Sequence, residues 1–220
     1  MANKTNAIID SLVGSITNAK ASLEPYPNWF LQECLPADVA EELLTLPFEA
    51  PALGGVSGKR ELHNKTRTYF NAQNMERFDV CKAFNDAFQS DAVTTKIQDA
   101  FSTNLTGTYL RVEFAQDIDG FWLEPHTDLG VKTFTMLMYL SNDPQHENLG
   151  TDYYDNDKKH LGCSPFKPNS AFVFVPSDVT YHGFEPRKIE GVRKSIIINY
   201  VTDEWRAREQ LPFPDKPLKL

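Results

Sequence analysis

The sequence predicts an α+β fold in which N-terminal helices support a β-sandwich or jelly-roll core. Apolar residues recur at helical spacing in much of the chain before about residue 105, and short stretches of strand character follow from about residue 106. No segment between about residues 100 and 203 has the composition of an interdomain linker. We therefore expect one domain over residues 1–220, with mainly helical support and loops in 1–105, the β core in 106–202 and a C-terminal tail in 203–220 that is extended or poorly ordered.

The helices are predicted from apolar spacing and from the prolines that end them. Helices are expected over residues 6–21, 36–47, 76–88 and 91–101. Pro25 and Pro47 terminate the first two, and Asp91 is the expected N-cap of the last. A short strand is expected over residues 28–31, and the glycine-bearing segment 49–65 reads as a loop.

The strands of the expected core are short, rich in β-branched or aromatic residues, and bounded by Asn, Asp, Gly or Pro. They are expected at residues 109–114, 121–124, 133–140, 151–154, 171–175 and 195–201. Residues 116–120 read as a turn cluster between the first two of them.

Composition and charge exclude several classes of function. The formal net charge of −8 makes non-specific binding to nucleic acid or to an anionic membrane unfavourable. The three cysteines contain no CxxC pair, so they suggest neither a zinc site nor a disulfide framework, and reduced thiols are the simplest interpretation. With no signal-like or membrane-length apolar run, we expect a cytoplasmic protein with no nucleic-acid or membrane partner.

His126 and Asp128 are the first two candidate site residues. They lie two positions apart, so on a strand both side chains would point to the same face. This spacing alone is common, and a strand-end pair in a polar network is its ordinary meaning. His182 follows the apolar strand 171–175 and its turn, at the rim of the same expected sheet system. Two histidines and one carboxylate form the facial triad that suits non-haem Fe(II) and leaves other coordination positions open.

Arg193 and Ser195 share one face at the start of the last apolar strand. A guanidinium there can hold a carboxylate through two hydrogen bonds, and the hydroxyl can add a third. Tyr139, near the end of the strand 133–140, is positioned to join the same carboxylate clamp, although a core or rim tyrosine explains it equally well.

Over residues 106–202 the chain resembles the 2-oxoglutarate- and Fe(II)-dependent dioxygenases, and most closely their prolyl-hydroxylase-like branch. The resemblance rests on His126-Thr127-Asp128, His182 and Arg193-Lys194-Ser195. It also rests on segments between these motifs, such as residues 136–141 and 168–174. It implies a double-stranded β-helix of the jelly-roll, cupin-like kind. The branch often carries a cosubstrate-facing tyrosine on the strand before the HxD segment, where this chain has Phe114 as the nearest equivalent.

Position by position, the resemblance makes His126, Asp128 and His182 the iron ligands. Arg193 would bind the distal carboxylate of 2-oxoglutarate, assisted by Ser195 and Tyr139. The reaction implied is an oxidation by O2 that converts 2-oxoglutarate to succinate and CO2 and hydroxylates a substrate. The carboxylate of Asp128 favours hydroxylation, since halogenating relatives have a small residue there.

The substrate is left open between a small molecule, an amino acid and a peptidyl residue, because substrate contacts lie on loops. Arg111 and Trp122, on strands that lead to the mouth of the core, are substrate-contact candidates, as is the segment 67–70, although structural roles are favoured for all of them. One alternative is a cupin-like metal-binding protein, an isomerase or a sensor, that uses no 2-oxoglutarate and gives Arg193 a structural role. The other, a non-catalytic interaction module, is disfavoured because all three ligands are present.

Overall fold

The computed structural model describes residues 2–52, 58, 67–128 and 130–219, which form two antiparallel sheets and a group of helices. The large sheet has the strand order β1-β2-β9-β6-β11-β4-β3, and the small sheet has the order β5-β10-β7-β8. The large-sheet strands are β1 (Lys20–Ser22), β2 (Asn28–Gln32), β3 (Thr68–Tyr69), β4 (Tyr109–Asp117), β6 (Lys132–Tyr139), β9 (Ser170–Phe174) and β11 (Arg193–Val201). The small-sheet strands are β5 (Leu123–His126), β7 (Asp152–Tyr154), β8 (His160–Cys163) and β10 (His182–Phe184).

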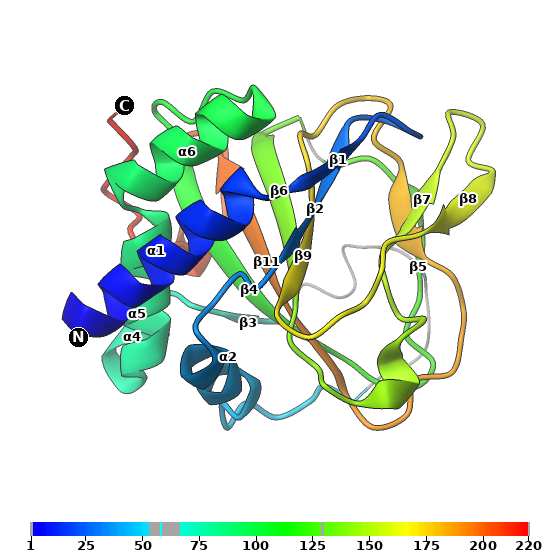
Figure 1. Ribbon diagram of the computed structural model, residues 1–220, viewed down its shortest axis with the longest axis horizontal. Helices are drawn as coiled ribbons and strands as arrows, with labels where there is room; N and C mark the ends of the chain where they lie inside the picture. Colours follow the sequence, from blue (N-terminus) through cyan, green and yellow to red (C-terminus); the bar gives the residue numbers. More distant parts are fainter. Residues whose placement is uncertain (1, 53–57, 59–66, 129, 220) are drawn as a thin grey trace.

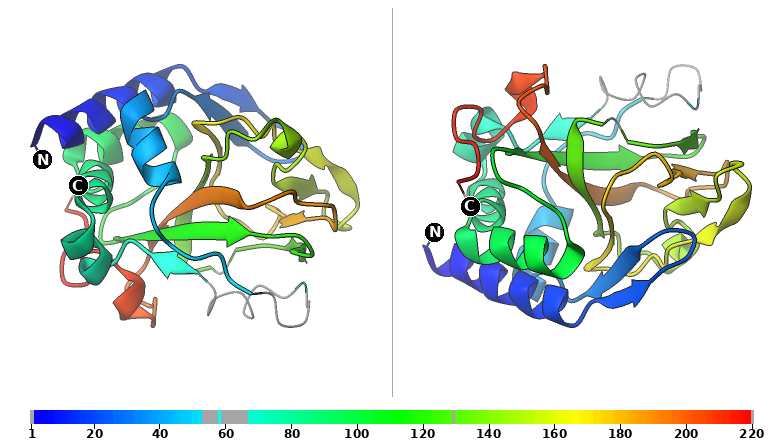
Figure 2. Two further views of the ribbon diagram at one scale, coloured as in Figure 1. Left: turned by 90° about the horizontal axis from the view of Figure 1, so that it is seen from below. Right: turned by 90° about the horizontal axis from the view of Figure 1, so that it is seen from above.

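Helices cover one face of the large sheet, and the small sheet lies on the opposite side (Figure 1, Figure 2). The helices are α1 (Ala2–Thr17), α2 (Ala37–Leu44), α4 (Ala72–Arg77), α5 (Asp79–Phe88) and α6 (Asp91–Phe101), with short 3-10 turns η2 (Pro144–His146) and η3 (Arg208–Gln210). A large apolar core joins α1, α5 and α6 to the sheet, and a second, aromatic-rich core lies on the side of the small sheet.

Strand alternation separates the helix-facing core from the space between the sheets. On β4, Leu110, Val112 and Phe114 pack into the helical core. The alternate residues of the same strand, Arg111, Glu113, Ala115 and Asp117, are buried on the other face. On β11 the same rule directs Ile196, Ile198 and Tyr200 to the helices and Arg193, Ser195 and Ile197 to the space between the sheets. The buried charged side chains of β4 and β11 therefore lie on the face of the large sheet that is turned away from the helices.

The predicted mixture of supporting helices and antiparallel sheet is present, with shifted boundaries. The expected helix 76–88 is two helices, α4 and α5, and Ser90 rather than Asp91 is the N-cap of α6, since its side chain accepts from the backbone N–H of Val93. The N-terminal part contributes more than support, because β1, β2 and β3 are strands of the large sheet. Of the expected loop 49–65, residues 53–57 and 59–65 lie outside the described residues.

The C-terminal tail packs against the body of the protein. Leu211 and Leu218 are buried, and the backbone N–H of Leu218 donates to the carbonyl of Thr108 at 2.9 Å. The three cysteines are free in this structure. Among the described residues, no helix combines the length and the apolar character needed to cross a membrane.

The packing of the helical core leads to a testable prediction about the stability of the protein. Phe84 is fully buried, with its ring centroid 4.7 Å from that of Phe88 and 5.7 Å from that of Phe70. Phe84→Ala should lower the free energy of unfolding, measured by urea denaturation, by about 3–5 kcal/mol because it leaves a cavity. Leu161→Ala, at a half-exposed position of β8, is the control and should change it by less than about 0.5 kcal/mol. Equal effects of the two variants would contradict this description of the core.

Candidate functional site

The structure brings His126, Asp128 and His182 together between the two sheets. His126 ends β5, His182 begins β10, and the two residues are directly paired across these antiparallel strands, with ring centroids 4.5 Å apart. Asp128 lies two residues beyond β5, so it reaches the site from the loop rather than from the strand assumed in the sequence argument. One ligand atom from each of the three residues lies within 4.8 Å of the others.

Both histidine rings are oriented by backbone carbonyls. The Nδ1 atom of His126 lies 2.8 Å from the carbonyl oxygen of Glu124, and that of His182 lies 3.0 Å from the carbonyl oxygen of Thr180. A carbonyl oxygen can only accept, so each ring donates from Nδ1, and in the neutral form of the ring this leaves the lone pair on Nε2. This arrangement is the one in which a histidine binds a metal through Nε2 while its other nitrogen is held by an outer hydrogen bond.

Close packing of the two strands requires Gly183, which follows His182. A Cβ atom at this position would lie 2.8 Å from the carbonyl oxygen of Leu123 on β5. The pairing register of β10 with β5 also shifts between His182 and Phe184. The glycine thus allows β10 to approach β5 where the two histidines meet.

The carboxylate of Asp128 is held at both oxygens. Lys132 Nζ donates to Oδ1 at 2.5 Å, and Thr135 Oγ1 donates to Oδ2 at 2.7 Å. Burial raises the pKa of Asp128, but the positive charge of Lys132, the nearby His182 and these two hydrogen bonds outweigh it and hold the pKa well below its ordinary value. Asp128 is therefore a fixed anion, whose side chain is only 4% exposed.

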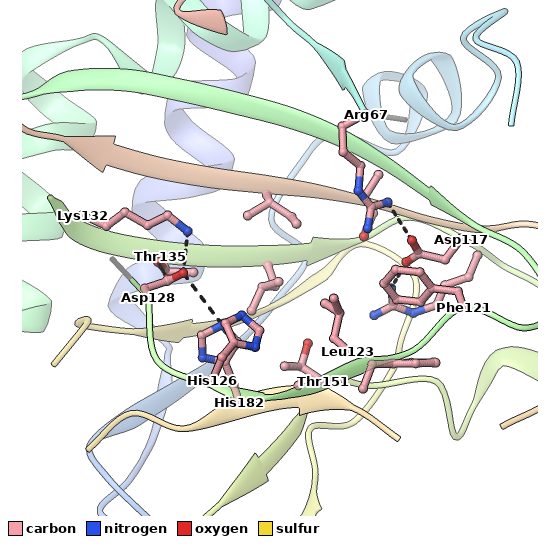
Figure 3. Close-up of a pocket in the computed structure, with 17 residues that line it drawn as sticks. Arg67, Asp117, Phe121, Leu123, His126, Asp128, Lys132, Thr135, Thr151 and His182 are labelled. Atoms are coloured by element: carbon pink, nitrogen blue, oxygen red, sulfur yellow. Dashed lines mark hydrogen bonds and ion pairs between the residues drawn. The ribbon is translucent and has the colours of Figure 1, made fainter. Parts of the chain in front are cut away.

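One pocket joins this triad to Arg193 and Ser195. Its lining includes His126, Asp128 and His182 as well as Arg193 and Ser195. Figure 3 shows the triad at one end of the pocket and Arg67, Asp117 and Phe121 at the other. The pocket therefore has the candidate ligand set at one end and guanidinium groups at the other.

The guanidinium of Arg193 is held on several sides. Its Nε donates to the carbonyl of Leu149 at 2.7 Å, and Nη1 donates to Asp117 Oδ2 at 2.6 Å. The guanidinium carbon lies 4.8, 5.4 and 5.8 Å from the ring centroids of Phe184, Phe166 and Tyr139. Nη2 has no hydrogen-bond partner among the described residues, and neither has the hydroxyl of the neighbouring pocket residue Ser195.

The third expected member of the carboxylate clamp, Tyr139, is fully buried and does not line the pocket. Its hydroxyl lies 2.8 Å from Thr151 Oγ1 and 2.6 Å from Ser164 Oγ, and it accepts from the backbone N–H of Thr151. Thr151 itself lines the pocket, so Tyr139 is positioned to act through Thr151.

The two candidate substrate contacts lie outside the pocket lining. Arg111 is buried and engaged, since its guanidinium donates to Glu113, Asn199, Gln210 and the Tyr69 hydroxyl. Trp122 is half-buried, and its ring lies against Gly58, where a Cβ atom would come within 2.2 Å of it. A role for either residue in substrate binding stays a prediction.

Arg67, from the candidate segment 67–70, lines the pocket, whereas the sequence did not point to five other lining residues: Ala115, Asp117, Lys132, Thr135 and Thr151. Asp117 was read as part of a turn, but β4 continues to it and pairs it with Arg193 on β11. The alternation of side chains between two faces continues from Arg111 to Asp117, and this pattern was the signal that the strand extends to Asp117. Phe114, the expected counterpart of a cosubstrate-facing tyrosine, faces the helices, and Ala115 occupies the pocket-facing position.

Comparisons with known proteins identify the fold. No family model matches the sequence, and no curated protein matches it. A prolyl hydroxylase from Trichoplax adhaerens, solved with a hypoxia-inducible-factor peptide, superposes with a TM-score of 0.59 at 16% identity, covering 94% of each chain. A Pseudomonas putida prolyl-4-hydroxylase gives 0.55 at 15% identity, covering 89% of this chain and 93% of that one.

A protein of different activity has a similar structure. The non-haem α-ketoglutarate-dependent epimerase of nogalamycin biosynthesis superposes with a TM-score of 0.53 at 12% identity, covering 90% of this chain and 83% of that one. The chain therefore has the fold of prolyl hydroxylases and other 2-oxoglutarate–Fe(II) oxygenases, as the resemblance implied. Because one fold hosts several reactions, the activity has to be argued from the site.

Proposed function

We propose that this protein is an Fe(II)- and 2-oxoglutarate-dependent dioxygenase whose two sheets form a double-stranded β-helix. The observation that carries the proposal is the single pocket lined by a His-Asp-His set and by Arg193 and Ser195. The donors suit the metal, since two imidazoles that are each held at Nδ1 by a backbone carbonyl and one carboxylate are the ligands typical of non-haem Fe(II).

In this proposal each pocket residue has one task. His126, Asp128 and His182 hold Fe(II), which together with 2-oxoglutarate supplies the activation of O2. Arg193 Nη2 and Ser195 Oγ bind the distal carboxylate of 2-oxoglutarate, and Thr151, supported by Tyr139, borders the same space. Thr135 and Lys132 keep the Asp128 carboxylate fixed. The products are succinate, CO2 and a hydroxylated substrate.

The substrate class stays broad. The prolyl hydroxylase from Trichoplax adhaerens binds a peptide, and the nogalamycin-pathway protein is an epimerase, so structures of this kind accept different partners. We propose hydroxylation of a small molecule, an amino acid or a peptidyl residue. Asp128 supports hydroxylation over halogenation because its carboxylate occupies the position that halogenating relatives leave open.

A metal-binding protein that does not use 2-oxoglutarate is the alternative, and one contact favours it. Arg193 Nη1 is bound to Asp117 at 2.6 Å, which is the kind of ion pair that a purely structural arginine makes. The unpartnered Nη2 and the Ser195 hydroxyl beside it favour the cosubstrate role. Binding of 2-oxoglutarate to the metal-loaded protein separates the two functions.

Succinate formation tests the proposed function. Protein reconstituted with Fe(II) in the absence of O2 is mixed with 2-oxoglutarate and air, and succinate is quantified by mass spectrometry. We expect slow succinate release without added substrate, dependence on Fe(II), and loss of release in His126→Ala. Succinate at the level of a metal-free control would contradict the proposal.

A further inference from the structure

The far end of the pocket contains a buried array of two arginines bridged by one aspartate. Arg67 Nη1 donates to Asp117 Oδ1 at 2.6 Å, and Arg193 Nη1 donates to Asp117 Oδ2 at 2.6 Å. The side chains of Arg67, Asp117 and Arg193 are 3%, 2% and 6% exposed. Figure 3 shows the Arg67 guanidinium beside Asp117, with the Phe121 ring next to them.

We propose that Asp117 and Arg67 are positioning residues for the cosubstrate carboxylate, acting through Arg193. This inference rests on the proposed function. Asp117 fixes the rotation of the Arg193 guanidinium so that Nη2 and the Ser195 hydroxyl face the pocket together, and Arg67 fixes Asp117 from its other oxygen.

Backbone geometry supports a positioning role. Asp117 pairs directly with Arg193 across β4 and β11, so the sheet register sets the distance between the two side chains. Arg193 Nε is already bound to the Leu149 carbonyl, and the ion pair to Asp117 occupies Nη1, which leaves Nη2 as the donor group for a ligand. A guanidinium held at two of its three nitrogens is pre-organised for binding at the third.

The local charge also leaves room for an incoming anion. Asp117 and Glu113 supply two negative charges against the three positive charges of Arg67, Arg111 and Arg193, so this buried cluster of ion pairs carries one net positive charge. Arg67 has additional support, since its Nε lies 3.3 Å from Glu113 Oε1 and its guanidinium carbon lies 5.2 Å from the ring centroid of Phe121. A buried cation favours an anionic partner, and a ligand carboxylate at Arg193 would meet this requirement.

A competing role for Asp117 is also physically reasonable, and it predicts the opposite change in the dissociation constant of 2-oxoglutarate. An internal carboxylate on Arg193 can compete with the ligand carboxylate for the same guanidinium. Under competition, removal of Asp117 would free Arg193 and tighten cosubstrate binding. Under positioning, the same removal loosens Arg193 and weakens binding. The direction of the change therefore decides between the two roles.

The experiment measures the dissociation constant of 2-oxoglutarate by calorimetry with Mn(II)-loaded protein, so that no turnover occurs. The variants are Asp117→Leu, Asp117→Asn and the double variant Arg67→Met/Asp117→Leu, which keeps the net charge of the wild type and removes the Arg67 guanidinium that Asp117→Leu alone leaves without this partner. We expect the dissociation constant to rise about tenfold in the two variants that contain leucine, and by about threefold in Asp117→Asn, which keeps a hydrogen-bond acceptor.

Kinetics provide a second readout that a purely structural role would not produce. The KM for 2-oxoglutarate should rise with the dissociation constant while kcat stays near the wild-type value, because no contact to the metal is altered. An unchanged or lower dissociation constant in the charge-matched double variant would overturn the positioning role. If the folded, Mn(II)-loaded wild type binds no 2-oxoglutarate, the proposed function fails and the inference fails with it.

Discussion

Asp128→Asn is expected to weaken binding of Fe(II) and Mn(II) by more than about 100-fold, because even the outer hydrogen-bond partners of a metal ligand are worth about 10–100-fold in affinity. The asparagine keeps the size of the side chain and can still contact Thr135, but it removes the negative charge that Oδ1 and Oδ2 share. The measurement is a Mn(II) titration followed by electron paramagnetic resonance, supported by metal analysis after Fe(II) reconstitution.

Asp152→Asn is the matched control for this variant. Asp152 is also a fully buried carboxylate, and its side chain binds His160 at 2.8 Å, Arg187 and the backbone N–H of Glu185 rather than a residue of the triad. We expect Asp152→Asn to retain stoichiometric metal binding while lowering stability. Retained tight binding in Asp128→Asn, or equal loss in both variants, would show that Asp128 is not a ligand.

Arg193→Met is expected to raise the dissociation constant of 2-oxoglutarate by about 30-fold or more, since truncating one partner of a buried, hydrogen-bonded charge pair costs about 2–5 kcal/mol. Methionine fills part of the space between the Phe184, Phe166 and Tyr139 rings but offers no donor. The metal affinity should stay near the wild-type value because Arg193 lies at the opposite end of the pocket from the triad. Calorimetry with Mn(II)-loaded protein measures both quantities.

Arg187→Met controls for the loss of a positive charge next to the same aromatic ring. The Arg187 guanidinium carbon lies 4.5 Å from the Phe184 ring centroid, but Arg187 pairs with Asp152 and is not among the pocket-lining residues. We expect its dissociation constant for 2-oxoglutarate to stay within about threefold of the wild type. Weakening of binding in Arg187→Met as large as in Arg193→Met would assign the effect to general charge rather than to a specific contact.

The part of the site that was predictable from sequence consists of residues with distinctive chemistry on recognisable strands. Arg193 and Ser195 lie at the start of a predicted strand and His126 lies just beyond another, whereas His182 lies on β10, a strand that was not predicted; the structure places all four on one pocket. The helical support and the antiparallel strands were also predictable, since each segment buries one face at its own period. Boundaries shifted where tertiary contacts extended an element, as with Asp117 at the end of β4.

The contacts that could not be predicted from the sequence join residues that are far apart in the chain. Arg67 meets Asp117 across 50 positions, and Arg193 meets Asp117 across 76, so no local pattern reports either pair. Tyr139 was expected to reach the cosubstrate, but Thr151 and Ser164 from other segments engage its hydroxyl. The strand β2 was predicted as an isolated piece, and its place beside β9 is fixed only by the assembled sheet.

The most direct test of the account is a titration of 2-oxoglutarate into Fe(II)-loaded protein without O2, followed by visible absorption. A 2-oxo acid that chelates Fe(II) in the triad produces a charge-transfer band, so the band reports metal and cosubstrate in one pocket. We predict a saturable band at one equivalent per chain, absent in Asp128→Asn and shifted to higher 2-oxoglutarate concentration in Arg193→Met. A folded, Fe(II)-loaded protein that develops no band at any concentration would contradict the account.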